Sequence, residues 1–294
     1  MAGMGGEPHA RSYGRVFDDV AAEYDRRRPT YPDELVDRAC LVAGIGSGDR
    51  VLEVGCGTGQ LTRSLLARGL HVTAVEPGKH LLSLADEKLG GRGQVEFVNA
   101  RFEDAPIAPS QFRAVFSASA FHWVDPQVSW EKAARVLVPG GTLALIQYCG
   151  LEEERSVHDH DAVMAALARI APDVAAGWPP IRDLATIAAG VEQRRGNVSE
   201  VWEWVGHQDV VWSYAGRLFC DVQVATTPAL LEQTADELNA LFRTLSFYHR
   251  LPPSRRRALE EENAAIHDRL GRPIRSSTVA VLVTAATRSE ALLV

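Results

Sequence analysis

The feature that most constrains the fold is a short apolar run that leads directly into a glycine-rich turn. Residues 51–59 read Val-Leu-Glu-Val-Gly-Cys-Gly-Thr-Gly, and Glu76 ends the next apolar stretch at 72–75. Glycines let the backbone turn sharply and approach a ligand, while a carboxylate about twenty residues later can accept both hydroxyls of a ribose. The pattern predicts a strand-turn-helix unit that binds an adenosine-containing molecule.

The spacing of these glycines distinguishes between adenosine cofactors. A dinucleotide site favours Gly-x-Gly-x-x-Gly, whose third glycine lets the helix pack closely beside a pyrophosphate. Gln60 stands at that third position here, and the following helix carries Leu61, Leu65 and Leu66. Strand, turn, helix and terminal acid together resemble motif I of the class I S-adenosylmethionine-dependent methyltransferases. The resemblance implies S-adenosylmethionine as cofactor, with the loop around its methionine part.

Helices and strands are predicted to alternate between about residues 33 and 148. The predicted helices are 33–44, 60–68, 79–89 and 127–137; the predicted strands are 50–54, 71–75, 95–98, 112–118, 142–148 and a last, antiparallel strand at 277–285. Such alternation predicts a parallel sheet covered on both faces, with ligands at the carboxyl ends of the strands. The expected fold is α/β: a Rossmann-like, doubly wound, mostly parallel seven-stranded sheet with a helical cap insertion.

Two further segments resemble the same family. Tyr24-Asp-Arg-Arg-Arg-Pro-Thr-Tyr-Pro32 is similar to the amino-terminal stretch of the trans-aconitate and malonyl-carrier-protein type methyltransferases, in which a helix and its proline-rich exit close over the cofactor. Residues 136–145 resemble the turn before the fifth strand, where a proline and two glycines end a helix and begin a strand.

These features predict four regions along the chain. We expect a disordered amino terminus at 1–14, a cofactor-binding core with an amino-terminal lid helix at 15–150, a helical substrate cap at 151–206, and the remaining core strands and helices at 207–294.

Composition narrows the range of partners. The 294 residues are 46% hydrophobic, which is enough for a full α/β core. The formal net charge of -7 argues against non-specific electrostatic binding to nucleic acid or to an anionic membrane. The longest apolar runs have strand length, the four cysteines form no Cys-x-x-Cys pair, and no charged-then-apolar leader follows Met1. We expect a cytoplasmic protein that acts on a small-molecule acceptor, with no membrane span; a homodimer stays open.

The cofactor site is predicted at the ends of the first four strands. Glu76 is expected to bind the ribose, while Arg101 stands where the family usually has an acid that meets the adenine amino group, which leaves adenine recognition open. Phe102 could supply its backbone amide and ring instead. The predicted cofactor-binding residues are Tyr24, Arg28, Glu53, Gly55, Cys56, Gly57, Glu76, Pro77, Arg101, Phe102, Ser117 and Ala118.

Two of these cofactor-binding residues, Tyr24 and Arg28, are predicted only from the resemblance to the methyltransferase family. Tyr24 and Arg28 match the family segment that reaches the methionine carboxylate of the cofactor. An ordinary surface role for Arg28 stays equally open.

His122 is the predicted catalytic residue. It follows the fourth strand in Phe121-His-Trp123, where the family places residues beside the transferring methyl group. A hydroxyl acceptor needs a base whereas an ionised carboxylate does not, so His122 could act as a base or orient the substrate. Phe121, Trp123 and, from the cap, Trp202 are the predicted substrate-binding residues, although a tryptophan in the cap could equally fill a secondary core.

The predicted reaction is in-line transfer of a methyl group to a carboxylate or hydroxyl oxygen of a small molecule. Two alternatives stay open: a catalytically silent regulatory protein that binds S-adenosylmethionine, and a nucleotide-dependent oxidoreductase on a related sheet, which Gln60 disfavours. The acceptor could be an aromatic natural product, a fatty or acyl thioester, or a small polycarboxylate.

Two charged clusters receive simpler interpretations. His158-Asp-His-Asp161 has its side chains spread around a helix start, so its acids fit capping better than metal binding, and no metal is expected. Residues 255–257, three arginines, are predicted to begin a solvated helix in which Glu260 to Glu262 are i,i+4 partners.

Overall fold

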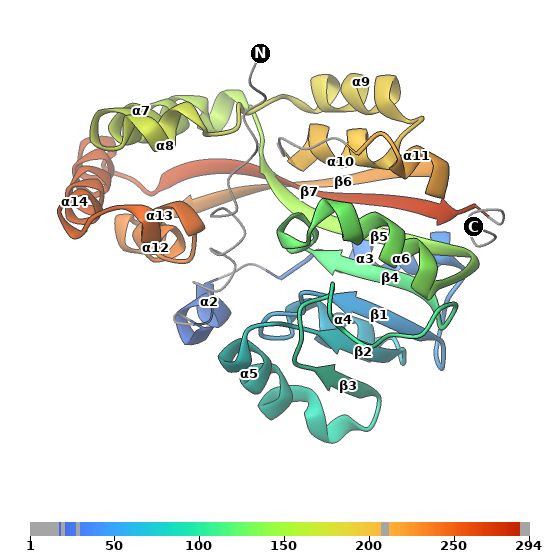
Figure 1. Cartoon of the computed structure of the whole chain (residues 1–294). Coiled ribbons are helices and arrows are strands. Elements are labelled where there is room, and N and C mark those ends of the chain that lie inside the picture. The colour runs from blue at the N-terminus through green and yellow to red at the C-terminus, as the bar shows by residue number, and fades with distance from the viewer. Residues whose placement is uncertain (1–17, 19–20, 28–29, 207–211, 289–294) are drawn as a thin grey trace, which may run out of the picture.

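The computed structural model describes residues 18, 21–27, 30–206 and 212–288 (Figure 1). The segment 1–14, predicted to be disordered, and Arg28 lie outside these described residues.

A single mixed sheet organises the described chain. Its strands are β1 (Arg50–Val54), β2 (His71–Val75), β3 (Val95–Val98), β4 (Phe112–Ala118), β5 (Leu137–Gly150), β6 (Phe219–Gln233) and β7 (Ile274–Thr287). The seven strands have the order β3-β2-β1-β4-β5-β7-β6; β1 to β5 pair in parallel, and β7 is antiparallel to both of its neighbours. The predicted α/β sheet and its antiparallel last strand are confirmed.

Helices cover both faces of the sheet. On one face are α3 (Asp33–Ala43), α4 (Gln60–Ala67) and α5 (Lys79–Leu89); on the other are α6 (Pro126–Val136), α9 (Leu184–Arg194), α10 (Val198–Gly206) and α11 (Ala215–Leu218). Each set buries its apolar side chains against the strands, which forms two separate hydrophobic cores. The central strands are buried on both sides, as parallel strands usually are.

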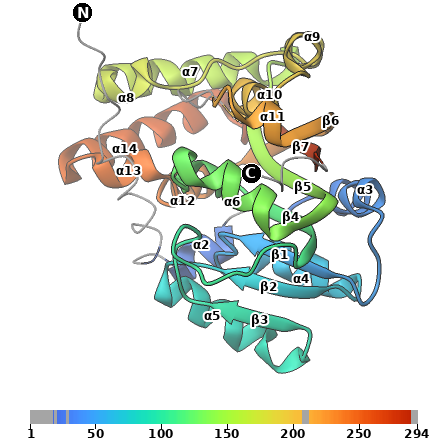
Figure 2. The same ribbon diagram turned by 45° about the vertical axis from the view of Figure 1, so that its right-hand side comes forward.

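A third hydrophobic core lies beyond the end of the sheet. It joins α7 (Glu154–Ile170) and α8 (Pro172–Ala176) to α12 (Ala235–Phe242), α13 (Ser246–Arg250) and α14 (Pro253–Leu270). Figures 1 and 2 both show these five helices apart from α9, α10 and α11. We call these five helices the cap cluster.

The edge hairpin carries part of this cap cluster. β6 and β7 pair along almost their whole length, from Phe219 with Thr287 to Gln233 with Ile274, and α12, α13 and α14 connect their far ends. The helices around the third core therefore come from both 151–206 and 207–294, whereas α9 and α10 pack on the sheet. The predicted cap at 151–206 thus coincides with only part of the cap cluster.

β5 differs from its prediction at its start. The strand begins at Leu137, not Thr142, and continues through the Pro-Gly-Gly segment, which was predicted to be a turn outside the strand. Leu137 pairs with Phe112 and Thr142 pairs with Ala114, so the extra residues bulge out of the ladder, with Gly140 at φ 73°. A bulge accommodates such residues without ending the pairing.

Candidate active site

The glycine turn after β1 has a backbone that other residues would strain. Gly55, Gly57 and Gly59 have φ values of 73°, 56° and 87°. A Cβ on Gly55 would lie 2.3 Å from Cβ of Ala120, and one on Gly59 would lie 2.8 Å from Cδ1 of Leu89. The turn is fixed by the Gly55 N–H, which donates to the Val75 carbonyl at 2.8 Å. Positive φ and close packing together explain the three glycines.

Glu76 lies at the end of β2 and faces this turn. Its side chain is 7% exposed, and its two carboxylate oxygens accept the N–H groups of Gly57 at 3.0 Å and Gly78 at 2.8 Å. Burial raises the pKa of Glu76, although both N–H bonds oppose that shift. The carboxylate also lines the main cavity, where a ribose could compete for its oxygens.

Three predicted cofactor residues support the turn from behind and do not line the cavity. Glu53 is 1% exposed, and its carboxylate accepts the Thr62 hydroxyl at 2.6 Å. The Ser117 hydroxyl donates to the Val54 carbonyl at 2.7 Å, and Cys56 is buried. The predicted direct contacts of Glu53, Cys56 and Ser117 with the cofactor therefore need correction, because their polar atoms point into the core or onto the backbone.

Glu53 is an unusual residue to bury. Burial raises its pKa to about 7, and the negative charge of Glu76 adds to the shift while the Thr62 hydrogen bond opposes it. Burial likewise raises the pKa of the Cys56 thiol, assisted by Glu53 and Glu76. Two ionisable side chains, Glu53 and Cys56, are thus buried in a low-dielectric environment behind the turn.

The wall beside β3 contains Pro77, Arg101 and Phe102, three of the predicted cofactor-binding residues, and all three line the cavity. The Arg101 guanidinium forms an ion pair with Glu103 at 2.6 Å, and the Phe102 ring is 3% exposed with the Lys132 ammonium 5.2 Å from its centroid. Neither side chain offers a carboxylate to an adenine amino group.

His122 occupies a single 3-10 turn, Phe121–Trp123, just after β4. Its exposed ring lines the cavity, 4.9 Å from the ring of Trp123, which also lines it. Ala118 of β4 is paired with Ile146 of β5, so Gln147 is the next residue along the neighbouring strand. Gln147 was not among the predicted site residues, because the register between two strands is not visible in the sequence.

Two predicted substrate contacts need correction. Phe121 is 3% exposed and packs edge-on against Trp130 at 5.0 Å, and Trp202 is 2% exposed within the core under α10. Neither ring lines the cavity. Both are apolar side chains on the buried side of their helices, and burial there removes large apolar surfaces from water.

A helix near the amino terminus covers the turn. α2 (Ala21–Arg27) contributes Asp25, which accepts the Thr58 hydroxyl at 2.7 Å and forms an ion pair with Lys88. Asp18 accepts the N–H groups of His80 and Leu81, the first turn of α5. The predictions for Tyr24 and Arg28 lie outside the described side chains. Asp18 and Asp25 were missed because their partners are far away in the sequence.

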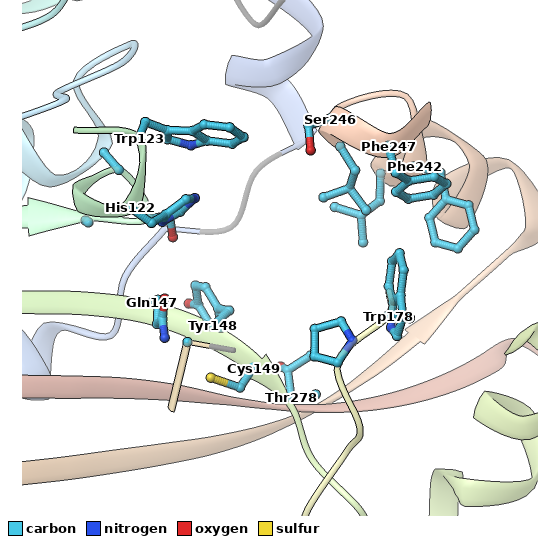
Figure 3. A pocket seen from close by; sticks show the side chains of 18 of the residues that line it. His122, Trp123, Gln147, Tyr148, Cys149, Trp178, Phe242, Ser246, Phe247 and Thr278 are labelled. Carbon is cyan, nitrogen blue, oxygen red and sulfur yellow. The ribbon is translucent and has the colours of Figure 1, made fainter. Parts of the chain in front are cut away.

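One large cavity runs from the glycine turn to the cap cluster, with a volume of about 1550 Å³. Figure 3 shows His122 and Trp123 on one side of it and Trp178, Phe242 and Phe247 on the other. Three side chains that line it, those of Gln60, Gln147 and His160, carry a buried Nε2 with no hydrogen-bond partner among the described residues. Such orphaned polar atoms suit a site that a ligand completes.

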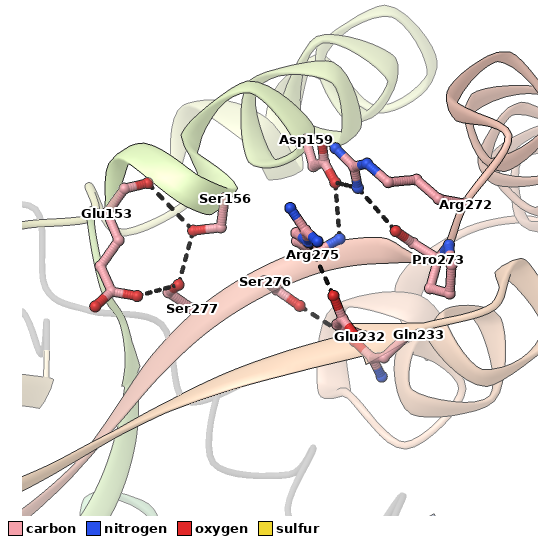
Figure 4. Close-up of polar contacts among 10 residues, drawn as sticks. All are labelled: Glu153, Ser156, Asp159, Glu232, Gln233, Arg272, Pro273, Arg275, Ser276 and Ser277. Atoms are coloured by element: carbon pink, nitrogen blue, oxygen red, sulfur yellow. Dashed lines mark hydrogen bonds and ion pairs between the residues drawn. The ribbon is translucent and has the colours of Figure 1, made fainter.

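Contacts across α7 revise the two interpretations of charged clusters. Asp159 does not cap a helix; its carboxylate accepts two bonds from Arg272, at 2.7 and 2.9 Å, and the N–H of Arg275 (Figure 4). Glu260 pairs with Arg243, which follows α12, and Glu262 pairs with Arg169 of α7 and with Arg269, seven residues later on α14; none of these pairs has the predicted i,i+4 spacing. The described residues contain no group of acids, histidines and cysteines arranged to hold a metal ion. Within the same residues, no helix has the length and apolar composition that crossing a bilayer requires.

The residues at the near end fit S-adenosylmethionine. Gly55 and Gly57 of the turn line the cavity, Glu76 offers a carboxylate at a strand end, and Gln60 offers a free N–H beside the turn. The apolar ring of Phe102 suits an adenine face.

Comparisons with known sequences agree with this geometry. Residues 52–145 match the profile of the family described as "Methyltransferase domain". An uncharacterized methyltransferase of Mycobacterium tuberculosis is 29% identical over 80% of this chain and 88% of its own length. A demethylmenaquinone methyltransferase of Clavibacter sepedonicus is 32% identical over 45% of this chain and 56% of its own length.

Solved structures share the fold at low identity. A candidate type II methyltransferase of Anaeromyxobacter dehalogenans has a TM-score of 0.55 at 21% identity, covering 89% of this chain and 98% of that chain. The [4+2]-cyclase SpnF has a TM-score of 0.50 at 15% identity, covering 98% and 99%. The sheet order, the glycine turn with Glu76 and the matched profile lead to one conclusion: residues 52–145 carry an S-adenosylmethionine-dependent methyltransferase domain.

Proposed function

We propose that this enzyme transfers the methyl group to an oxygen, carboxylate or hydroxyl, of a small molecule. The observation that carries the proposal is the continuity of the cavity, which joins the cofactor turn to His122 and then to a large chamber under the cap cluster. Bound S-adenosylmethionine supplies an electrophilic methyl group, so the protein mainly has to align an acceptor and exclude water.

The near end would hold the cofactor through the backbone and two side chains. Glu76 accepts the ribose hydroxyls, in exchange for its present bonds to the N–H groups of Gly57 and Gly78. Gln60 donates its free Nε2 N–H to a polar group beside the turn. α2, tied to the turn by Asp25 and Thr58, covers this end and limits the entry of water.

His122 and Gln147 would meet the acceptor. Both line the cavity, His122 from the turn after β4 and Gln147 from within the neighbouring β5, and the buried amide of Gln147 has an N–H to donate to an acceptor oxygen. With a carboxylate acceptor, His122 orients the ionised group; with a hydroxyl, it accepts the proton that leaves as the methyl–oxygen bond forms.

The test begins with calorimetric titration of S-adenosylhomocysteine and continues with an acceptor screen followed by mass spectrometry for a 14-Da gain, about one CH₂. We expect His122→Ala to lower turnover by about 100-fold, the lower end of the range for general acid–base catalysis, while product-cofactor affinity stays within about twofold. Binding without methyl transfer to any carboxylate or hydroxyl would contradict oxygen as the target atom.

The catalytically silent regulatory protein is the alternative that this screen addresses. The fold alone does not fix the reaction, since a neighbour with this fold is described as a cyclase. Tight binding of S-adenosylhomocysteine with no transfer to oxygen, nitrogen, sulfur or carbon acceptors would favour the silent protein.

A further inference from the structure

The cavity is larger than one ligand requires. Small-molecule sites usually enclose about 300–1,000 Å³, whereas this cavity has about 1550 Å³. Its near end belongs to the cofactor turn, Glu76 and Phe102. The space beyond His122 is therefore left for the acceptor, and the residues that line this space indicate the chemical class of the acceptor.

The far end of the cavity is an aromatic and aliphatic box. The ring of Phe247 packs edge-on against Trp178 at 5.2 Å and against Phe242 at 5.5 Å, and all three line the cavity (Figure 3). Six further apolar lining residues there are Val163, Met164, Leu167, Leu238, Leu241 and Leu245. We call this set of nine residues the apolar chamber.

Three charged side chains that line the cavity near the apolar chamber, those of Arg255, Arg275 and Asp159, have opposite charges beside them. The Arg255 guanidinium lies 3.3 Å from the Asp173 carboxylate, and that of Arg275 lies 2.9 Å from Glu232. Asp159 is neutralised by Arg272. This arrangement does not resemble a pocket for several carboxylates, which needs cations available to the ligand.

The middle of the cavity is polar, whereas its far end is lined by the apolar chamber with His160, Ser246 and Arg250 as polar neighbours. His122 and Gln147 stand in the middle, and the orphaned Nε2 of Gln147 is buried in a side chain that is 6% exposed. A ligand that satisfies both regions has one polar group and one long apolar body, because burying apolar surface is favourable only where no polar group loses its hydrogen bonds.

From this contrast we infer that the methyl acceptor is an amphipathic molecule, with its reacting oxygen at His122 and Gln147 and an extended aliphatic or polycyclic body in the apolar chamber. The inference rests on the proposed function, of which it names the substrate class. It disfavours small polycarboxylates, which were one of three acceptor classes open from the sequence.

The length of a probe tests the inference directly. Wild-type protein saturated with S-adenosylhomocysteine is titrated with n-alkanoic acids of increasing length and with citrate. Each buried methylene is worth about a three- to fourfold gain in affinity, so affinity should rise steeply with length and then level off when the apolar chamber is full. Citrate should bind more weakly than the longest acids by at least about tenfold.

A charge placed in the apolar chamber provides the matched variant. Leu241 is half-buried, lines the cavity and lies outside the third hydrophobic core, so Leu241→Asp should fold. It should weaken the longest acids by more than tenfold and the shortest ones little, whereas Leu241→Met should restore binding. The control Leu41→Asp makes the same change on a side chain of α3 that is 70% exposed.

Three results would overturn the inference: affinity that does not depend on chain length, citrate that binds as tightly as the long acids, or equal losses in Leu241→Asp and Leu41→Asp. The titration of wild-type protein with alkanoic acids of increasing length tests the inference even if a variant is unstable. Failure of the proposed function is distinguishable, because it appears as lost S-adenosylhomocysteine binding or as absent methyl transfer, whereas the length series measures binding alone.

Discussion

The two ends of the cavity are built in different ways. The cofactor end uses β1, β2, β4 and the turns that follow them, and its key contact, from the Gly57 N–H to Glu76, spans 19 residues. The acceptor end joins α7 and α8 to α12, α13 and α14, and its tie from Asp159 to Arg272 spans 113 residues. A local motif therefore sets the cofactor, whereas distant segments set the acceptor.

This difference explains how one fold serves many acceptors. The cofactor end needs fixed backbone geometry, which few residues other than glycine tolerate. The acceptor end needs only an apolar lining of suitable volume, which many sequences provide. α2 contacts both α5 and α12, so it touches both ends of the cavity.

The largest effect is expected from Gly57→Val at the cofactor end. A β-branched residue is strongly disfavoured at φ 56°, and its side chain would enter the cavity. Binding of S-adenosylhomocysteine should weaken by at least about 100-fold, or about 3 kcal/mol, in calorimetry. Gly140→Val is the control, since Gly140 also has positive φ but nothing within 4 Å of an added Cβ. Equal loss of binding in both variants would mean that backbone strain alone is responsible, and not the side chain that enters the cavity at residue 57.

A smaller loss is expected from Glu76→Ala. It removes the ribose acceptor and leaves the N–H groups of Gly57 and Gly78 without their present partner, so cofactor affinity should fall by about 1–3 kcal/mol. Glu76→Gln keeps one acceptor oxygen and should lose less. Unchanged affinity in Glu76→Ala would refute the assignment of Glu76 to the ribose.

Asp159→Asn is expected to act at the acceptor end only. Burial raises the pKa of Asp159, but its bonds to Arg272 and to the Arg275 N–H outweigh that and hold the pKa below its ordinary value. Wild-type protein should lose this stabilisation as pH falls through the lowered pKa, because the folded carboxylate must then take up a proton. The variant should be less stable by about 2 kcal/mol at pH 7 and lack that acid-side loss.

Urea titrations from pH 3 to pH 7 measure this difference, and S-adenosylhomocysteine binding at pH 7 should stay within about twofold of wild type. A cofactor affinity that falls together with stability would show that the two ends are coupled through the sheet.

A pH-dependent effect on stability is expected from Glu53→Gln, under the glycine turn. Since burial raises the folded pKa of Glu53 to about 7, the unfolded chain releases its proton at lower pH than the folded chain does. Wild-type stability should therefore fall as pH rises from about 4 to about 7, by on the order of 2 kcal/mol, and Glu53→Gln should lack this decline.

Thermal unfolding of wild type and Glu53→Gln at pH 5 and pH 8 gives the comparison. Glu53→Asp is the companion variant that keeps an ionisable group. Parallel pH dependence in wild type and Glu53→Gln would place the titrating group elsewhere.

Predictions from the sequence were correct where residues that are close along the chain are also neighbours in the folded structure. Five of the predicted strands and helices have the bounds that the structure gives, namely 50–54, 71–75, 79–89, 95–98 and 112–118. The sequence also identified Gly55, Gly57, Glu76 and His122, all of which line the cavity. The start of β5 was wrong because strand pairing absorbed its glycines in a bulge.

Sequence reasoning failed where a side chain has two environments available. Phe121 and Trp202 lie on helical turns that offer a core side and a cavity side, and only packing decides between them. Gln147 gave no signal, because its position depends on the register of β5 against β4. The partners of Asp18, Asp25 and Asp159 are likewise fixed by tertiary contacts and not by local spacing.

The sequence alone determined the cofactor class and the parallel sheet, because a strand, a turn of positive φ and a strand-end acid are local features with one common geometry. The tertiary structure decided which side chains face the acceptor and how apolar that end is. Helices separated by some 60 residues, from α8 at 172–176 to α12 at 235–242, form the apolar chamber together only after the β6–β7 hairpin brings them to the same end of the sheet. Burial of their shared apolar surface drives that assembly, and such burial depends on the folded arrangement and not on the order of residues within any one segment.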